Sequence, residues 1–119
     1  MIKMTMFLKR KPGLSHEAFV RHHVDKHGPL FRSIPEAQVH CLRYIQTHPV
    51  RLATDAVTNA DFDGTAELWF DDEAGMAAVL GSETYKNEVF PDEKTFLDHE
   101  NTLILVGQQV EIISDDRQG

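Results

Sequence analysis

Residues 16–30, HEAFVRHHVDKHGPL, form the stretch around which the rest of the chain is organised. Apolar residues recur along it at the spacing of one face of a helix: Phe19, Val20 and Val24. This spacing predicts an amphipathic helix whose apolar side packs against a core. The pair Gly28-Pro29 predicts the helix end, because proline lacks an N–H and glycine favours helix termini.

Three histidines lie in the second half of this predicted helix: His22, His23 and His27. His27 falls in its last predicted turn, where backbone carbonyl groups lack partners and carry partial negative charge. An imidazole exchanges protons near neutral pH, so at this position it can serve as a general acid or base. The same histidine could instead cap the helix by bonding its terminal carbonyls.

The length and charge of the chain limit its function classes. At 119 residues we expect one domain over residues 1–113, followed by a charged, frayed tail over residues 114–119. The net charge of −7 and the lack of a basic stripe argue against a nucleic-acid partner. No apolar run approaches the roughly 20 residues of a membrane span, so we expect no membrane partner.

Cysteine content and the amino terminus favour the cytoplasm. Cys41 is the only cysteine, so the chain can form neither a disulfide framework nor a thiolate metal site by itself. Basic residues closely flank the first apolar segment, which does not fit a signal peptide. We therefore expect a cytoplasmic protein.

Four segments alternate apolar and polar residues with the period of a β-strand: residues 2–9, 38–48, 64–70 and 102–113. Gly107 suggests a bulge within the last of them. Helical spacing covers residues 16–27 and 72–89, with an interruption at Gly81-Ser82. The order βαββαβ predicts an α+β, ferredoxin-like domain, in which both helices cover one face of a four-stranded antiparallel sheet.

Three connections complete this outline. Residues 30–37 predict an irregular segment that folds back over the core, and the polar residues 49–63 predict a long loop. Pro91 predicts a separate turn after the second helix, with Phe96 and Leu97 packed inward.

Both faces of the predicted sheet carry apolar residues. On one face we expect Met4, Met6, Leu68 and Phe70, and on the other Phe7, Leu42, Tyr44 and Trp69. Helices can cover only one face, and a second copy of the same sheet is the simplest cover for the other. The sequence therefore predicts a homodimer, in which two sheets meet face to face.

Four segments carry a family resemblance: KRKPGLSHEAF (9–19), HGPL (27–30), AELWFDD (66–72) and FPDEKTFLDHE (90–100). In this order they resemble the EthD family of the dimeric α+β-barrel superfamily, over residues 3–110. The resemblance implies two ferredoxin-like subunits joined sheet to sheet, each with a pocket between its sheet and its helices. The superfamily includes aromatic polyketide cyclases and dehydratases, lactone isomerases, and monooxygenases that need neither metal nor flavin.

The resemblance also implies site residues. The family's helix-end histidine falls on His27, and its aspartate before the last strand falls on Asp92. Asp92 or His99 could orient His27 or relay a proton, as the second group of an acid–base site. Without such a role, Asp92 would be an acidic residue in a first helical turn after Pro91, and His99 a partly exposed residue near a strand.

Three further residues are candidate substrate-binding residues. Tyr44 and Trp69 would suit a pocket wall that stacks on an aromatic ring, or they would be buried at the dimer interface. Glu67 lies between apolar residues of a predicted central strand, so it must pair with a partner or face a cavity.

Metal binding is a weaker interpretation of the histidines. His23 and His27 are four residues apart, a spacing that can bind zinc. The residue after His23 is Val24, however, rather than the glutamate of a zinc-protease helix. We expect no metal and no cofactor.

Together with the EthD resemblance, these residues lead us to expect a small hydrophobic or aromatic carbonyl compound as the ligand. They also predict a cofactor-free cyclisation, dehydration or isomerisation, with His27 as the general acid or base. Two alternatives stay open: a non-catalytic binding or accessory protein of a degradation or biosynthesis pathway, and a haem- or metal-binding member of the superfamily.

Overall fold

The computed structural model describes residues 1–115, and its sheet has the topology that the sequence predicts. Four antiparallel strands lie in the order β2-β3-β1-β4. Their bounds are Ile2–Leu8 (β1), Cys41–Thr47 (β2), Gly64–Phe70 (β3) and Leu103–Gln108 (β4). The α+β, ferredoxin-like fold is therefore confirmed.

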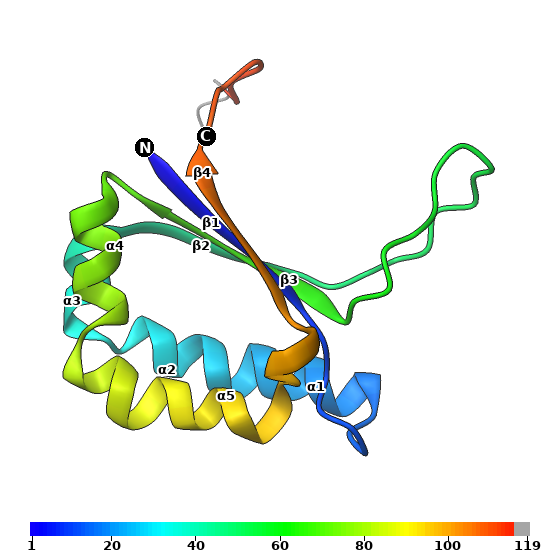
Figure 1. Cartoon of the computed structure of the whole chain (residues 1–119), viewed down its shortest axis with the longest axis horizontal. Coiled ribbons are helices and arrows are strands. Elements are labelled where there is room, and N and C mark those ends of the chain that lie inside the picture. Colours follow the sequence, from blue (N-terminus) through cyan, green and yellow to red (C-terminus); the bar gives the residue numbers. More distant parts are fainter. Residues whose placement is uncertain (116–119) are drawn as a thin grey trace.

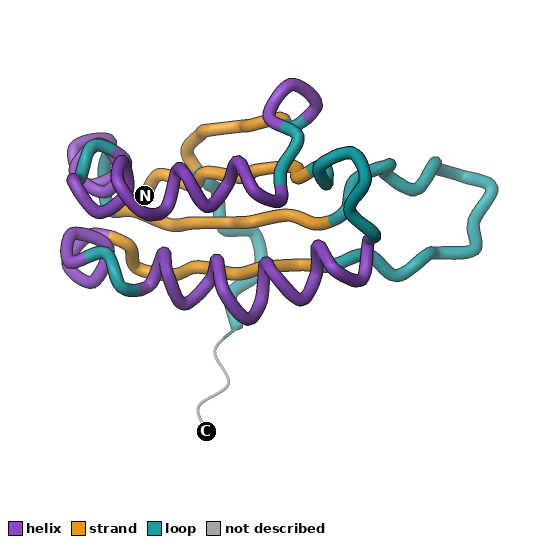
Figure 2. Tube along the Cα trace, turned by 90° about the horizontal axis from the view of Figure 1, so that it is seen from below, coloured by secondary structure: helices purple, strands orange, loops and turns teal. Residues whose placement is uncertain are grey.

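The long helices lie on one face of this sheet (Figures 1 and 2). The helical segments are His16–His22 (α1), His23–His27 (η1), Gly28–Arg32 (α2), Pro35–His40 (α3), Glu73–Leu80 (α4), Tyr85–Val89 (η2), Phe90–Phe96 (α5) and His99–Asn101 (η3). Buried side chains of β1 and β3 form the floor of the core: Met4, Leu8, Ala66, Leu68 and Phe70. Phe19 of α1 and Phe96 of α5 belong to the same core and are almost fully buried.

The first long helix does not end at Gly28-Pro29 as predicted. Segments α1, η1 and α2 continue without a break to Arg32, and η1 is a π-helical turn that closes when the Gly28 N–H donates to the His23 carbonyl. Proline has no N–H, and its ring collides with the carbonyl four residues earlier in an α-helix. A wider turn relieves both constraints, so the helix accommodates the proline.

The second long helix also contains a π-helical turn before a proline. Pro91 does not begin a separate turn, because η2 and α5 are continuous through it. The Phe90 N–H donates to the Tyr85 carbonyl and closes a second π-helical turn. In both helices the proline lies six positions after the first residue of the π-helical turn. Pro29 follows His23 by this distance, and Pro91 follows Tyr85 by the same distance. The two proline-containing stretches lie close together, since α2 packs against η2.

The segment before β2 also differs from the prediction. Residues 35–40 form helix α3, although alternation suggested that a strand begins at Gln38. Pro35 occupies the first helical position, where its fixed φ angle favours a helix and its missing N–H costs nothing. The strand therefore begins at Cys41.

A bulge near the start of β2 changes which side chains face the helices. The pairing with β3 shifts by one residue between Cys41 and Arg43. As a result Tyr44 pairs with the buried Leu68 and packs against the core on the helix side. Its predicted place on the same face as Trp69 is wrong.

Strand β4 is shorter than predicted. It ends at Gln108, and it pairs with β1 through Gly107 without a register shift, so this strand lacks the predicted bulge.

The predicted loop 49–63 is present and extends away from the sheet (Figure 1). The predicted tail 114–119 lies mostly outside the described residues and stays a prediction. In the described part of the chain, no helix has both the length and the apolar character to cross a membrane.

The sheet face away from the helices carries both polar and apolar side chains. Lys3 and Glu67 form an ion pair across the two central strands, and the Lys3 ammonium lies 4.9 Å from the centroid of the Trp69 ring. Phe7, Ile45, Leu103 and Leu105 lie on the same face. Strand β4 is the most open part, since Leu103 is 55% and Leu105 is 63% exposed.

Candidate active site

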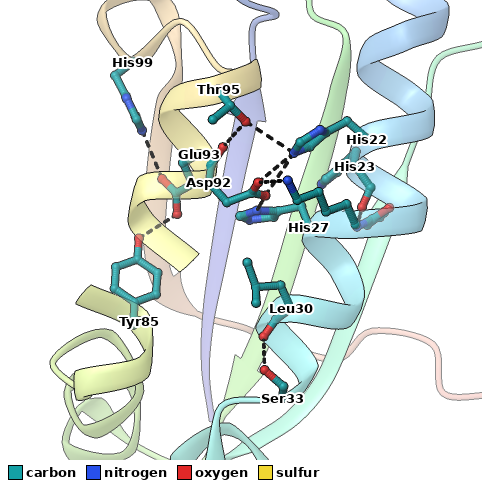
Figure 3. Close-up of polar contacts among 12 residues, drawn as sticks. His22, His23, His27, Leu30, Ser33, Tyr85, Asp92, Glu93, Thr95 and His99 are labelled. Atoms are coloured by element: carbon teal, nitrogen blue, oxygen red, sulfur yellow. Dashed lines mark hydrogen bonds and ion pairs between the residues drawn. The ribbon is translucent and has the colours of Figure 1, made fainter. Parts of the chain in front are cut away.

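Asp92 lies where the two long helices meet. It is a residue of the first turn of α5 and is 6% exposed. From the other helix, Nδ1 of His27 lies 2.9 Å from Oδ2, and Nε2 of His22 lies 3.0 Å from both carboxylate oxygens (Figure 3). The Lys26 ammonium is 3.6 Å from Oδ1. One carboxylate therefore binds three side chains of the first long helix.

Hydrogen-bond chemistry fixes the state of the His27 ring. An ionised carboxylate can only accept, so Nδ1 of His27 carries the proton that it donates to Asp92. In the neutral ring, Nε2 is then the unprotonated nitrogen. His27 is 7% exposed and lines a cavity under the helices. This pairing has the form of a general base held by a second group.

The hydrogen bonds to Asp92 keep it ionised. Burial by itself raises the pKa of a carboxyl group, but hydrogen bonds from His27 and His22, with their charges, outweigh burial. The pKa of Asp92 therefore lies below its ordinary value. A carboxylate that stays charged can stabilise the imidazolium that forms when His27 takes a proton.

A small cavity lies between the sheet and the two long helices. Its volume is about 30 Å³, which is room for one or two water molecules. Apolar side chains of β1, β3 and the helices form most of its wall. Its polar lining consists of His23, His27, Tyr44, Tyr85 and Glu93.

A second chain of polar groups reaches this cavity from α5. Glu93 is 5% exposed; one of its oxygens accepts a 2.7 Å hydrogen bond from the Tyr85 hydroxyl, and the other lies 3.0 Å from Nε2 of His99 (Figure 3). Burial, and then the charge and hydrogen bond of Glu93, raise the pKa of Tyr85 well above its ordinary value. The hydroxyl therefore stays protonated. Of the two residues that could orient His27, Asp92 binds it, whereas His99 pairs with Glu93.

His23 is the most deeply buried polar residue of the site, at 1% exposed. Its Nδ1 lies 2.9 Å from Nε2 of His48, just after β2. Burial, followed by the positive charges that neighbouring imidazoles would carry, lowers the pKa of His23 to about 3. The ring is therefore neutral at physiological pH.

The three predicted substrate-binding residues lie on different faces of the sheet. Tyr44 lines the cavity; its hydroxyl accepts a 2.9 Å hydrogen bond from Gln46, and burial raises its pKa to about 12. Glu67 and Trp69 lie on the face away from the helices, where Glu67 pairs with Lys3. The structure does not bring these two residues to the His27 cavity.

An open groove of about 610 Å³ runs along the edge strand β2, beside α2 and α3. Phe31 and Tyr44 line both this groove and the His27 cavity. Their rings meet edge to face, with centroids 5.1 Å apart. These two side chains therefore form the partition between the cavity and the groove.

The two histidines whose spacing suggested zinc have separate partners. His27 binds Asp92, and His23 binds His48. Among residues 1–115, no group of three histidine, cysteine, aspartate or glutamate side chains is arranged so that it could hold a metal ion.

The EthD domain model matches residues 11–100, which is most of the chain. The protein belongs to the EthD family. The predicted family is thus confirmed, and the matched range contains His27, Asp92 and the other polar residues of the cavity. No curated protein matches the sequence.

Several solved structures have a fold similar to that of this EthD-family chain. An ethyl tert-butyl ether (EthD) family protein from Bacillus halodurans is 21% identical, with a TM-score of 0.70 over 92% of this chain and 99% of that one. An EthD-like protein from Ralstonia eutropha is 15% identical, with a TM-score of 0.68 over 98% and 96%. A dimeric ferredoxin-like protein of unknown function from Thermobifida fusca is 10% identical, with a TM-score of 0.64 over 91% and 90%. At these identities the likeness shows the fold.

Sequence patterns missed four residues of this EthD site: His22 as a partner of Asp92, His48, Tyr85 and Glu93. The sequence held a signal for Glu93. Adjacent residues of a helix point in different directions, so an acidic residue next to Asp92 can take part in a different set of contacts. No signal existed for His48, which reaches His23 from a different element.

Replacing Asp92 with asparagine should lower the free energy of unfolding by about 1–3 kcal/mol near neutral pH, because three partners lose a charged acceptor. Folding lowers the pKa of Asp92, so its contribution is present above the ordinary carboxyl value of about 3.9. This contribution is lost as the pH falls through the folded-state value. Urea unfolding of wild type and variant at neutral and at strongly acidic pH should show a difference that shrinks in acid.

The matched control is Asp25→Asn, since Asp25 is an exposed aspartate on the first long helix, which carries His22 and His27. Its effect should stay within about 0.5 kcal/mol. An Asp92→Asn variant that is as stable as wild type at neutral pH, or equally destabilised at both pH values, would contradict the assignment.

Proposed function

We propose that this EthD-family protein is a cofactor-free acid–base enzyme that acts on a small hydrophobic or aromatic carbonyl compound. His27 is the general acid and base, and Asp92 orients it. The observation that supports this most is the 2.9 Å hydrogen bond from Nδ1 of His27 to Asp92. This bond uses Nδ1, so Nε2 is the nitrogen left to act as the base, and His27 lines a mostly apolar cavity.

The proposed reaction is a proton transfer next to a carbonyl group. Nε2 of His27 removes a proton from the α-carbon, and the electron pair of that C–H bond forms the double bond of an enolate. The imidazolium then returns the proton to another carbon, which isomerises the substrate, or to a leaving hydroxyl group, which departs as water. Asp92 accepts the Nδ1–H bond throughout and stabilises the positive ring.

The cavity has to widen for such a substrate. Its volume of about 30 Å³ is far below that of ordinary ligand pockets, which are roughly 300–1,000 Å³. Movement of Phe31 and Tyr44 would join the cavity to the groove of about 610 Å³ beside it. The proposal therefore places the substrate entrance at these two rings.

A non-catalytic carrier is the second candidate function. The observation that favours it is the groove, because its lining contains no histidine. A hydrophobic ligand could occupy the groove without contact to His27, and its affinity would then survive the loss of that imidazole.

We also propose that two copies join through the sheet face away from the helices. One of the similar structures is described as dimeric. The exposed Leu103 and Leu105 of β4 lie on that face, where a second copy would cover them. In this arrangement Glu67 and Trp69 lie at the subunit contact instead of the substrate cavity.

Replacing His27 with alanine should lower catalysed proton exchange by roughly 100-fold or more, because the base is lost. The probe is 1-phenyl-1,3-butanedione, an aromatic diketone with acidic α-protons. Its deuterium uptake in heavy water, followed by proton NMR, gives the rate.

The matched control for this experiment is His22→Ala. His22 binds the same carboxylate of Asp92 but does not line the cavity, so its loss should reduce the rate far less. Unchanged exchange in His27→Ala, or no rate above buffer with wild-type protein, would count against an enzyme. Saturable binding that survives His27→Ala, together with absent exchange, would favour the carrier.

Replacing Leu105 with aspartate should convert the dimer to a monomer, because a charge would be buried at the contact. Sedimentation equilibrium checks the mass. Val50→Asp is the control, since Val50 is 90% exposed in the loop after β2. A wild-type protein that sediments as a monomer would refute the dimer.

A further inference from the structure

Nε2 of His23 is the one buried side-chain nitrogen or oxygen without a hydrogen-bond partner among residues 1–115. The ring is 1% exposed and lines the same cavity as His27. An unpaired buried polar atom destabilises the folded state, so proteins rarely retain one without a use. A ligand atom in the cavity would satisfy it.

The other nitrogen of the His23 ring is occupied, since Nδ1 lies 2.9 Å from Nε2 of His48. Burial, followed by the charge of His16, lowers the pKa of His48, so both rings are neutral at physiological pH. Two neutral rings share one proton across this contact. If His48 donates it, His23 carries its own single proton on Nε2, which becomes a free donor at the cavity wall.

We propose that His23 is the hydrogen-bond donor for the carbonyl oxygen of the substrate, with its proton on Nε2 and with His48 donating to Nδ1. This inference rests on the proposed function, in which His27 removes the α-proton. His48 is then a positioning residue, because it acts only by fixing the tautomer of His23.

The two imidazoles are placed for one shared substrate. The ring centroids of His23 and His27 lie 6.2 Å apart on successive turns of one helix, and both rings line the cavity. A carbonyl oxygen and its neighbouring α-carbon are bonded through one atom, so one small group can contact both rings. A neutral imidazole also suits an enolate oxygen, because it donates a hydrogen bond without giving up its proton.

The step balances in protons and electrons. One proton leaves the α-carbon and arrives at Nε2 of His27. The electron pair of the C–H bond forms the carbon–carbon double bond, and the π pair of the carbonyl moves to its oxygen. The Nε2–H of His23 stabilises this oxygen where its negative charge develops, which is the role of an oxyanion hole.

The charge of Glu93 narrows the substrate class. Its carboxylate lines the same cavity and accepts the Tyr85 hydroxyl hydrogen bond. A substrate carboxylate placed there would meet this negative charge without a compensating cation in the lining of the cavity. The substrate is therefore an uncharged ketone, ester or lactone with an α-hydrogen.

The tautomer of His23 tests the proposal directly. Two-bond proton–nitrogen correlation NMR on protein with isotopically labelled histidine distinguishes protonated from unprotonated ring nitrogens. The His23 signals are those that a His23→Gln variant lacks. The expected result at neutral pH is a proton on Nε2 and none on Nδ1. A proton on Nδ1 would overturn the proposal, whatever the fate of any variant.

Phenol tests whether the donor meets an oxygen in the cavity, and toluene is the matched ligand without that oxygen. Phenol should bind wild-type protein about 5- to 10-fold more tightly than His23→Leu, which corresponds to one lost hydrogen bond. Phenol should also shift the His23 Nε2–H signal, and toluene should bind both proteins equally. Absent phenol binding, or an equal loss for both ligands, would overturn the proposal.

The variant His27→Ala separates this inference from the proposed function. It should lose proton exchange but keep the His23 tautomer and the preference for phenol. If exchange survives in His27→Ala, the base is wrong while the donor stands. If exchange requires His27 but His23 is protonated on Nδ1, the donor is wrong while the base stands.

Discussion

The hydrogen bonds of the Asp92 carboxylate join the two long helices, and the geometry of the candidate site depends on them. The carboxylate joins residues 65 positions apart in the chain and holds His27 by the nitrogen that cannot act as the base. Because the carboxylate also binds His22, its removal would leave two imidazoles of the first helix without their acceptor. The contribution of Asp92 to stability and its role in the proposed proton transfer therefore rest on the same hydrogen bonds.

The two π-helical turns explain how these groups meet. A π-helical turn inserts one extra residue and rotates the side chains that follow it relative to an α-helix, and such turns occur often at functional sites. His27 is the last residue of the first wide turn, and Asp92 follows the second by three positions. Both turns precede a proline, so the backbone constraint of Pro29 and Pro91 also affects the directions of the His27 and Asp92 side chains.

The sequence predicts the fold well because alternation and helical spacing are local signals. The resemblance points to His27 and Asp92, and the structure brings these two side chains together. The sequence does not predict that their helices pass through a proline, because a proline ordinarily ends a helix and only a wider turn accommodates it. The face of Tyr44 depends on a bulge that alternation cannot show. The pairing of His99 with Glu93 depends on how far α5 continues, which the break expected at Pro91 concealed.

A double-mutant cycle on the free energy of unfolding tests the central claim most directly. The variants His27→Ala, Asp92→Asn and their combination are unfolded in urea at neutral pH. A direct, buried hydrogen bond between the two groups predicts a coupling energy of about 1–3 kcal/mol. Additive effects, with a coupling energy near zero, would contradict the claim that the hydrogen bond to Asp92 positions the His27 ring.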